Sequence, residues 1–524
     1  MSETESEGAL RKNIDAVRTI VRTVKSTLGP MGRDKMMVDA GGNSITTNDG
    51  ATILRELDVS HPGGKMIIEC AQTQESLCYD GTSSTVVLAG ELLSNSEALL
   101  NKGLHPNVVC KGYNDAARMA VEYLEGYVED GGGNSMTRLA FGGIGTHEGG
   151  LYAESLSTEE DNNLKHIAKT AITGKTVDAA LDEVSNLCVQ AVKKAGSAEK
   201  VRTLSLQGGG LQDSYLFNGA IVNKDIVHEK EVDGKYNIVL LNTGLEPEKN
   251  EENVQVQMDM QGYTQFKSSS KDDLLEQAKL ICTWLPTGGL IFIRDGAHDS
   301  VCAYLEKNEV SVVRRLPEST MRALSDTLGI SIAQTPSDIE CSASGSVMKQ
   351  RHNDVNYLFV EGEVASTQST LVLRGATTTT LDEIERGFDD ALGVVSLVMN
   401  GDKVVAGGGS AYACMAALLR SKAAEVSGRP QMAIEAFADA LECIPATIAE
   451  NGGQDPLDCI LALRNKIQND EYYYGPDLNN GGVCDMVHNG VIEPASLVRQ
   501  VVLGANEVTT AILKIDDMIA MRGE

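Results

Sequence analysis

The chain has 524 residues, which is too long for one hydrophobic core and predicts three or four domain-sized units. Apolar residues make up 42 % and aromatic residues only 4 %, a composition typical of a globular protein whose core is built from aliphatic side chains on helices. The net charge of −29 argues against a nucleic-acid partner, and no apolar run approaches the roughly 18 residues that a membrane span needs.

The first part of the chain is predicted to be helical. Apolar residues at helical spacing predict a helix over residues 10–28, which Gly29-Pro30 ends. Residues 36–38 and 44–47 favour a small hairpin around Gly41-Gly42-Asn43. Further helices are predicted over residues 50–57, 65–77, 82–98 and 106–127.

The middle of the chain changes character. Residues 130–161 lack periodicity between two glycine runs, which indicates a surface insertion or linker. Helices are predicted over 164–171, 177–195 and, after a polar stretch at 246–270, over 271–285. Strands are predicted at 202–206, 219–222, 238–241, 290–293, 310–313, 357–359 and 371–374. Because the chain after residue 380 is again predicted to be almost entirely helical, an α/β part is expected to be inserted into a helical part.

Cysteine and histidine spacing gives no sign of a metal centre. The eleven cysteines are scattered, none closer than eight positions apart, so CxxC knuckles are excluded and buried thiols in a reducing compartment are expected. The histidines form no HExxH pattern, and no zinc site is proposed. The acidic, polar residues 1–7 do not resemble a secretory signal, so a cytoplasmic location is expected.

Two short loops near the start of the chain place an acidic residue and a glycine just before a predicted helix. In Asp80–Thr85, Gly81 would let the backbone approach a phosphate, the amides and hydroxyls that follow would face that anion, and Asp80 offers the hard oxygen that Mg²⁺ prefers. Asn48–Thr52 repeats this arrangement. Each loop alone is equally compatible with an ordinary helix cap or turn.

Other glycine-containing segments are open to two interpretations as well. Ser26–Pro30 offers a helix end and a rigid turn, and Gly407-Gly408-Gly409 could line a ligand or form a plain turn between helices. A P-loop is rejected, because Gly174-Lys175-Thr176 has Lys169 where the motif requires glycine. The acidic segment 385–392 is by composition a solvated helix face.

Taken together, these segments resemble the group II chaperonins, the archaeal thermosome and eukaryotic cytosolic type. The resemblance covers nearly the whole chain and is weakest at residues 130–160 and 246–270. The acidic composition is also compatible with a divergent paralogue of the haloarchaeal kind. The stretches that carry the resemblance are Thr27-Leu28-Gly29-Pro30, Asn48 to Leu54, Asp80-Gly81-Thr82, Val86 to Leu93, Gly407-Gly408-Gly409, Ala436 to Glu442, Ala449 to Gly453 and Glu493-Pro494.

The resemblance implies a multidomain α fold with an α/β insert. Both chain ends would form a helical equatorial domain, joined through a small intermediate domain to an α/β apical domain with a helical protrusion near 246–285. The implied segments are equatorial 1–132, intermediate 133–205 with the insertion near 130–160, apical 206–348, intermediate 349–398 and equatorial 399–524. Such subunits assemble into double rings, homo- or hetero-oligomeric, that enclose non-native client proteins.

The resemblance also implies a site for ATP or ADP with Mg²⁺. Asp80 would bind the metal, while Asp49 and Asp390 would position or activate the attacking water. The residues expected to hold the nucleotide are Asn48, then Thr27, Leu28, Gly29 and Pro30 along its surface, Gly81, Thr82, Ser83 and Ser84 at the phosphates, Lys175 at the γ-phosphate, Gly408 at the nucleoside and Glu493 at the ribose.

The chain departs from the family pattern at several positions. Tyr79 replaces the usual glycine before the aspartate and is unfavourable there if the backbone needs a positive φ. Ser83-Ser84 keep the usual hydroxyls, whereas Val498 stands where many relatives carry a lysine, with Arg499 adjacent. The C-terminal residues 522–524 lack a Gly/Met-rich tail.

Three classes of function follow. The leading one is an ATP-driven protein-folding machine, motivated by Asp49, Asp80 and Asp390. The second is a specialised or weakly active ring subunit that binds nucleotide but mainly holds clients, motivated by Tyr79 and Val498. The third, an unrelated metabolic kinase, has little support because no substrate-specific acid–base site is recognised.

Overall fold

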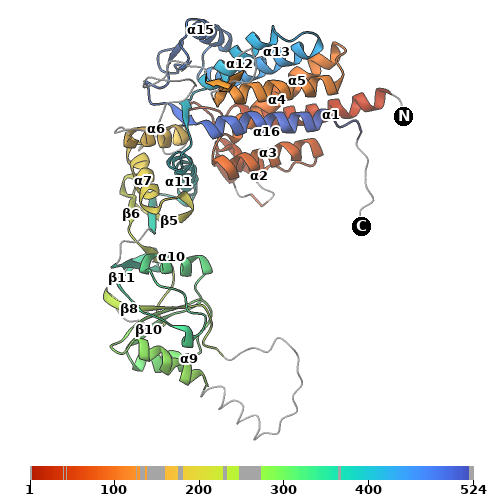
Figure 1. Ribbon diagram of the computed structural model, residues 1–524. Helices are drawn as coiled ribbons and strands as arrows, with labels where there is room; N and C mark the ends of the chain where they lie inside the picture. The colour runs from red at the N-terminus through yellow and green to blue at the C-terminus, as the bar shows by residue number, and fades with distance from the viewer. Residues whose placement is uncertain are drawn as a thin grey trace. The chain divides into compact units, whose positions relative to one another are not determined.

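The chain forms two compact units in the computed structural model (Figure 1). Residues 1–190 and 382–524 make the first unit, and residues 191–381 make the second. The structure describes residues 3–38, 41–42, 44–125, 127–129, 136–138, 160–174, 181–227, 233–246, 273–363 and 368–517. The first unit therefore contains both chain ends, while the finer division into five segments stays a prediction.

Helices dominate the first unit. Two of them, α7 and α11, cross the boundary between the units. The helices are α1 (Glu3–Lys25), α2 (Gly50–Glu56), α3 (Pro62–Cys78), α4 (Thr82–Asn101), α5 (Pro106–Leu124), α6 (Glu160–Ile172), α7 (Leu181–Ala195), α11 (Thr378–Met399), α12 (Ser410–Ala423), α13 (Arg429–Leu441), α14 (Cys443–Asn451), α15 (Pro456–Gln468) and α16 (Ala495–Leu513).

Short antiparallel strand pairs connect these helices. They are β1 (Lys35–Val38) with β2 (Ser44–Thr47), β3 (Tyr127–Glu129) with β4 (Met136–Arg138), β14 (Val404–Ala406) with β17 (Ile492–Pro494), and β15 (Tyr474–Pro476) with β16 (Val483–Asp485). The hairpin β1–β2 confirms the prediction. The expectation of an almost entirely helical chain after residue 380 is wrong in detail, because strands of only three residues carry too short a pattern to be recognised.

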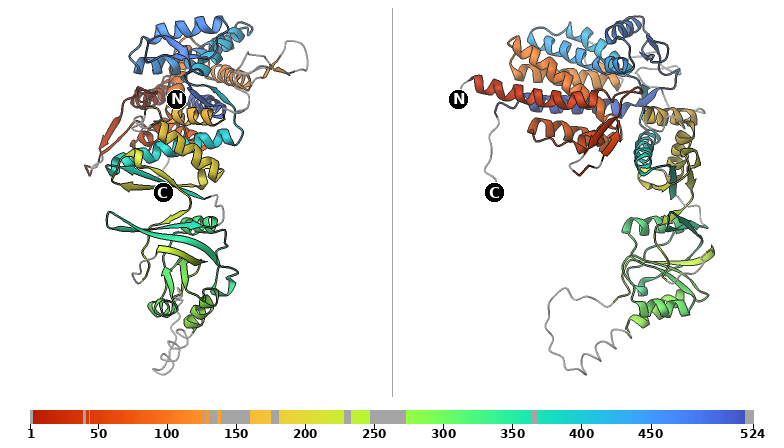
Figure 2. Two further views of the ribbon diagram at one scale, coloured as in Figure 1. Left: turned by 90° about the vertical axis from the view of Figure 1, so that its left-hand side faces the viewer. Right: turned by 180° about the vertical axis from the view of Figure 1, so that it is seen from behind.

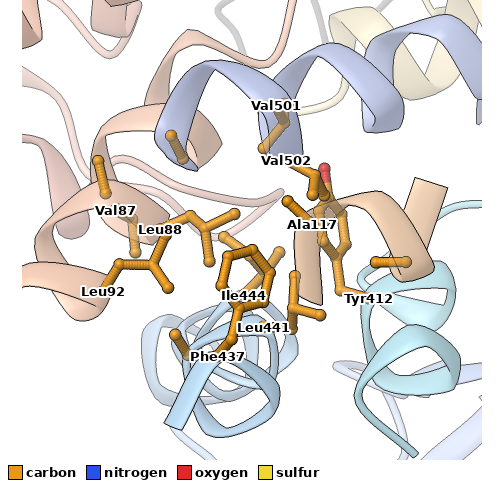
Figure 3. Packing of buried hydrophobic residues seen from close by; sticks show 14 of the residues in the cluster. Val87, Leu88, Leu92, Ala117, Tyr412, Phe437, Leu441, Ile444, Val501 and Val502 are labelled. Carbon is orange, nitrogen blue, oxygen red and sulfur yellow. The ribbon is translucent and has the colours of Figure 1, made fainter. Parts of the chain in front are cut away.

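The two ends of the chain pack into one helical core. Figure 2 (right) shows α1 in red and α16 in blue within the same bundle. In α1, Ile14, Val17 and Val24 are buried on one face, as the helical spacing predicts. Figure 3 shows the centre of the core, where Leu88 of α4 and Phe437 of α13 lie among side chains of α14 and α16. This core fixes the loops at the helix ends, where the candidate site lies.

A buried carboxylate joins three helices on the other side of the bundle. Glu442, between α13 and α14, is 8 % exposed and accepts hydrogen bonds from Arg420 of α12 (2.6 and 2.8 Å) and Arg464 of α15 (2.8 and 2.6 Å). Burial alone would raise the pKa of Glu442, but hydrogen bonds from Arg464 and Arg420 outweigh it and hold the pKa below its ordinary value.

Replacing Glu442 with Gln should lower the free energy of unfolding by about 2 kcal/mol. This is less than the roughly 3–5 kcal/mol of a fully buried pair, because the Arg464 side chain is 40 % exposed and solvent screens it. The stabilisation from the ion pairs of Glu442 is fully present above the ordinary carboxyl pKa, and it is lost as the pH falls through the lower pKa that Glu442 has in the native state. Denaturant unfolding at pH 7 measures this loss of stability. The control is Glu425→Gln, which removes the exposed ion pair with Lys422 and should change the stability little. Equal effects of both changes would contradict the role of Glu442.

The second unit is built on a six-stranded mixed sheet. The strand order is β10-β9-β8-β11-β12-β7, with β8, β9 and β10 parallel and the other pairs antiparallel. The strands are β7 (Ala220–Val222), β8 (Asp233–Leu241), β9 (Gly289–Ile293), β10 (Val310–Val313), β11 (Ala343–His352) and β12 (Val355–Gly362). A separate three-stranded sheet has the order β5-β13-β6 and contains β5 (Val201–Gln207), β6 (Tyr215–Phe217) and β13 (Ser369–Gly375).

Helices cover both faces of the larger sheet. Leu240 and Phe292 face one way and pack with Leu324 of α10 (Glu318–Leu328), while neighbouring strand residues face the other way and pack with Leu305 of α9 (Asp299–Lys307) and with the helix over 273–284. This alternation gives the α/β architecture that the sequence predicts. The long strand β11 was missed, since its exposed face interrupts the apolar pattern.

Several expectations can be compared directly with these units. All eleven cysteines are free thiols, most of them buried or half-buried, with Cys341 exposed. Among the described residues, no helix is both long enough and apolar enough to cross a bilayer. The predicted insertion near 130–160 and the protrusion near 246–285 fall largely outside the described residues.

Candidate nucleotide site

A cavity of about 410 Å³ opens in the first unit where the loops from both chain ends meet. Its walls come from residues 27–30, 48–50 and 80–84, from one side of α6 with residues 173 and 174 after it, from Leu181 at the start of α7, and from the C-terminal part from residue 408 onward. The predicted residues that line it are Thr27, Leu28, Gly29, Pro30, Asn48, Asp49, Asp80, Gly81, Thr82, Ser83, Ser84, Gly408 and Glu493. Sequence segments that are hundreds of residues apart are thus brought together.

The turn after α1 forms one wall. α1 ends at Lys25, three residues earlier than predicted, and Gly29 then adopts a φ of 87° that favours glycine. Asn451 fixes this turn from α14, because its side-chain amide donates to the carbonyls of Lys25 (3.0 Å) and Leu28 (2.8 Å). The backbone of the turn is therefore held in place by the C-terminal half of the chain.

Asp49 caps the short helix α2. Its carboxylate accepts hydrogen bonds from the amides of Ala51 (3.3 Å) and Thr52 (2.9 Å), and its own amide donates to the Thr47 hydroxyl at 3.1 Å. Asp49 is therefore a helix N-cap, which is one of the two interpretations that the sequence left open, and it also lines the cavity. The two interpretations of this loop are compatible.

The Asp80 loop leads into α4, a helix of 20 residues. Gly81 is the N-cap with a φ of 85° and provides no side-chain cap, so the first amides of α4 are available to an anion. Asp80 accepts a 2.7 Å hydrogen bond from the Gly81 amide, and Gln74, which is almost fully buried, donates to the Asp80 carbonyl at 2.9 Å. The loop is thus shaped for phosphate while Asp80 keeps a carboxylate at its edge.

Two glycines allow these loops to approach one another. A Cβ on Gly50 would lie 2.3 Å from the Ser83 hydroxyl oxygen and 3.3 Å from the Ser83 amide nitrogen, so a larger residue would displace the Ser83 side chain and crowd its backbone. A second uncapped helix start lies opposite, where Gly408 (φ 63°) and Gly409 (φ 83°) lead into α12. A Cβ on Gly409 would lie 2.8 to 2.9 Å from Pro445, which makes glycine a requirement there.

Glu493 lies in β17, where it pairs with Val405 of β14. Burial and, to a smaller extent, the nearby charge of Asp80 together raise the pKa of Glu493 to about 8. One of its carboxyl oxygens has no hydrogen-bond partner among the described residues. A buried polar atom of this kind at a cavity wall suits a hydroxyl-bearing ligand.

The raised pKa predicts a pH-dependent stability. Because the native state holds the Glu493 proton up to about pH 8 and the unfolded chain releases it near its ordinary 4.5, stability falls as the pH rises through this window. Replacing Glu493 with Gln should therefore stabilise the protein at pH 9, by on the order of a few kcal/mol, and change little at pH 4.5. Denaturant midpoints at the two pH values check this, and an equal effect at both would contradict it.

One side of α6 contributes cavity residues that the sequence did not single out. His166, Lys169, Thr170 and Thr173 recur at the i, i+3, i+4 and i+7 positions and all line the cavity. Lys169 also forms an ion pair with Asp182 of α7. This polar stripe was the available signal, but it has the same pattern as an ordinary solvated helix face.

Two predicted residues are not among the described residues that line the cavity. Asp390 lies half-buried in the middle of α11 and is not among the lining residues. Lys175 lies outside the described residues. Gly174, just before it, lines the cavity, and its carbonyl accepts a hydrogen bond from the Asn48 side chain.

The structure also locates the departures from the family pattern. Tyr79 ends α3 in the left-handed region, with a φ of 61°, which costs a non-glycine residue about 1 kcal/mol or more. Val498 is fully buried in the core rather than in the cavity wall, where its neighbour Leu497 lies instead. Arg499 pairs with Glu125 at 3.0 Å.

The chemistry of the cavity suits a phosphate ester that brings its own metal. Two uncapped helix starts attract the anion, while Asp49 and Asp80 supply carboxylates. The described residues include no cluster of three or more His, Cys, Asp or Glu that could hold a metal ion unaided. Because Mg²⁺ is commonly held by one or two carboxylates together with substrate phosphates, the residues present fit Mg²⁺ bound jointly with a nucleotide.

Comparison with known proteins identifies the family of this chain. The model of the TCP-1/cpn60 chaperonin family matches residues 20–522. The chain belongs to this family. Among its relatives, the thermosome subunit of Methanopyrus kandleri is 38 % identical over 531 residues, which cover 98 % of this chain and 92 % of that protein. The group II resemblance seen in the sequence is therefore confirmed.

Further relatives are of the same kind. The thermosome subunit alpha of Archaeoglobus fulgidus is 36 % identical, with 99 % of this chain and 93 % of that protein covered. The thermosome subunit alpha of Halobacterium salinarum is also 36 % identical, covering 99 % of this chain and 89 % of the relative. The similarity to this chaperonin family thus extends over nearly its whole length.

Proposed function

We propose that this protein is an ATP-hydrolysing subunit of a double-ring chaperonin that encloses non-native proteins and assists their folding. The observation that carries the proposal is the cavity in which Asp49, Asp80 and two uncapped helix starts from opposite ends of the chain converge. Family membership supports the same activity. A metabolic kinase has no comparable support.

The predicted residues that line the cavity have roles that their positions support. The turn at residues 27–30 packs along the nucleotide, and the amides and hydroxyls of residues 81–84 hold the phosphates, with Asn48 beside them. Gly408 lies at the nucleoside, and Glu493, with its unpartnered oxygen, accepts a ribose hydroxyl. Lys175 is assigned to the γ-phosphate by the family resemblance alone.

Asp80 would hold Mg²⁺ together with the phosphates. The metal, when bound, neutralises phosphate charge that would otherwise oppose attack by water. Asp49 and Asp390 are the carboxylates assigned to orient that water and accept its proton. Because Asp390 is on α11 and outside the cavity wall, hydrolysis would require α11 to bring it to the nucleotide.

The partners we propose are other chaperonin subunits and non-native client proteins in the cytoplasm. Relatives from Archaeoglobus fulgidus carry the names thermosome subunit alpha and beta, so a ring of more than one subunit type is one possibility for this chain, and a ring of identical subunits is the other. The strongly negative charge gives no support for nucleic acid as a partner.

Refolding of a denatured client tests the proposal. The purified oligomer should raise the yield of active client with ATP well above the yield with a non-hydrolysable ATP analogue, and light scattering should show a large ring. Equal yields with both nucleotides would overturn ATP-driven folding.

A second candidate is a subunit that binds nucleotide but turns over little and mainly holds clients. The strained Tyr79 beside Asp80 favours this alternative, because it departs from the glycine usual in the family. Suppression of client aggregation without ATP-dependent recovery would support it.

A further inference from the structure

Tyr79 has a left-handed backbone conformation that is unfavourable for any residue other than glycine. The contacts of its side chain offer a reason for a tyrosine at this position. It ends α3 with φ 61° and ψ −5°, and its amide donates to the Glu75 carbonyl at 2.8 Å. Glycine is the usual residue at a helix end of this geometry. The next residue in the chain is Asp80, so any constraint on the Tyr79 ring acts directly on the Asp80 loop.

The ring of Tyr79 fills a notch on α11 that glycine creates. A Cβ on Gly393 would lie 2.0 Å from Cγ of Tyr79 and 2.4 and 2.5 Å from its two Cδ atoms. Gly393 is buried in the interior of a 22-residue helix and has no positive φ that would require glycine. Glycine is unfavourable in a helix interior, so both partners carry a local cost, and their mutual contact accounts for both.

Gly393 lies next to Asp390 on α11. Residues three apart in a helix are surface neighbours, so the notch lies one turn beyond the Asp390 carboxylate. A second contact holds the same side of the helix: the Thr47 hydroxyl donates to the buried carboxylate of Glu383 at 3.4 Å. Glu383 and Asp390 are seven residues apart, which places them within about 20° of each other around the helix axis.

The two contacts come from equivalent places in the site. Thr47 directly precedes the loop with Asn48 and Asp49, and Tyr79 directly precedes Asp80. The residue that precedes each of these two loops thus contacts α11, and the two contacts lie on either side of Asp390. The orientation of α11 and the positions of the two loops are therefore mechanically linked.

We propose that Tyr79 is a positioning residue that seats α11 through Gly393 and so sets the approach of Asp390 to a nucleotide bound at Asp80. This deepens the proposed function and rests on it. The ring works by shape: any rotation of α11 that moves Gly393 displaces Tyr79 and, through the adjoining peptide bond, Asp80. A ring that merely fills space in the core would affect stability but not the rate of turnover at saturating ATP.

Four variants in the full-length oligomer test the inference: Tyr79→Gly, Tyr79→Phe, Gly393→Ala and the double variant Y79G/G393A. We expect Tyr79→Gly and Gly393→Ala each to lower kcat for phosphate release about tenfold while the Kd for MgADP changes less than about threefold. Tyr79→Phe keeps the ring and should restore turnover to within about twofold of wild type. In the Tyr79→Gly background, adding Gly393→Ala should lower kcat no further, because the ring that the alanine Cβ would contact is absent.

Three results would overturn the inference. Independent, multiplicative losses in the double variant would show that the two positions do not act through their contact. A Tyr79→Gly variant with lower thermal stability but unchanged kcat would show a purely structural ring. A rise in KM with kcat unchanged would show an effect on nucleotide binding instead.

Hydrogen exchange supplies a readout that does not depend on turnover. Peptides covering residues 383–399 should exchange at least about tenfold faster in Tyr79→Gly than in wild type, while peptides of α16 should not change. Equal exchange over 383–399 would overturn the seating of α11. A wild-type protein without phosphate release would overturn the proposed function, whereas normal release that falls in Asp390→Asn but not in Tyr79→Gly would overturn only the role of Tyr79.

Discussion

Replacing Asp390 with Asn is expected to lower the rate of phosphate release by about 100-fold or more. The change keeps the shape of the side chain and removes the carboxylate that we propose to accept a proton from the attacking water. Asp390 lies outside the wall of the nucleotide cavity, so the affinity for MgADP should remain within a few-fold of wild type. Steady-state phosphate release and calorimetric titration of MgADP measure the two quantities.

The chain supplies a matched control in the adjacent residue. Asp389 is on the same helix, and its charge adds to the larger effect of burial in raising the pKa of Cys188 of α7. Asp389→Asn should leave the rate within about twofold, because Asp390 and not Asp389 is the carboxylate of α11 that we propose to act on the attacking water. Equal losses in the two variants would show an effect on α11 as a whole, and an unchanged rate in Asp390→Asn would remove Asp390 from the mechanism.

Replacing Asp80 with Asn is expected to weaken binding of MgADP by about 100-fold, the scale for losing one charged partner. An Asn oxygen can still accept the 2.7 Å hydrogen bond from the Gly81 amide, so the loop should keep its shape while the charge is lost. The dependence of ADP affinity on Mg²⁺ should largely disappear as well. Titrations of ADP with and without Mg²⁺ measure both effects.

Glu493 provides an internal check on the same variant. Its pKa is raised by burial and, to a smaller extent, by the charge of Asp80, so Asp80→Asn should lower the pKa of Glu493. The pH dependence of stability described above should then shift toward lower pH. Unchanged MgADP affinity in Asp80→Asn would exclude Asp80 as the metal-holding residue, and an unchanged pH profile would show that the two carboxyls do not interact.

Local sequence signals predicted the parts of the site that depend on short stretches of chain. Asp49 and Gly81 begin helices because of what each residue type provides: a capping carboxylate in Asp49, and in Gly81 the lack of a Cβ that allows a positive φ. Both properties are visible in the sequence. The buried face of α1 and the hairpin β1–β2 were predicted for the same reason. Only the family resemblance, however, indicated that the two loops share a site with Gly408 and Glu493.

Features that depend on packing between distant segments could not be predicted. The contact of Tyr79 with Gly393 joins residues more than 300 positions apart, and neither residue alone indicates the other. From the sequence, Tyr79 was singled out only because a positive φ at this position would be unfavourable for tyrosine. The cavity face of α6 was missed because a row of His, Lys and Thr is equally typical of a solvated surface. Strand β11 was missed because the sheet, rather than the apolar pattern of the strand, stabilises it.

The central claim is that both ends of the chain form one nucleotide site. Photolabelling of the full-length protein with an azidoadenine nucleotide, followed by peptide mapping, tests it most directly. We predict Mg²⁺-dependent labelling of peptides from the N-terminal part, around residues 27–30, and from the C-terminal part, around residues 408–412 and 489–493, all of it competed away by excess ATP. Labelling confined to residues 191–381, or labelling that ATP does not displace, would contradict the account.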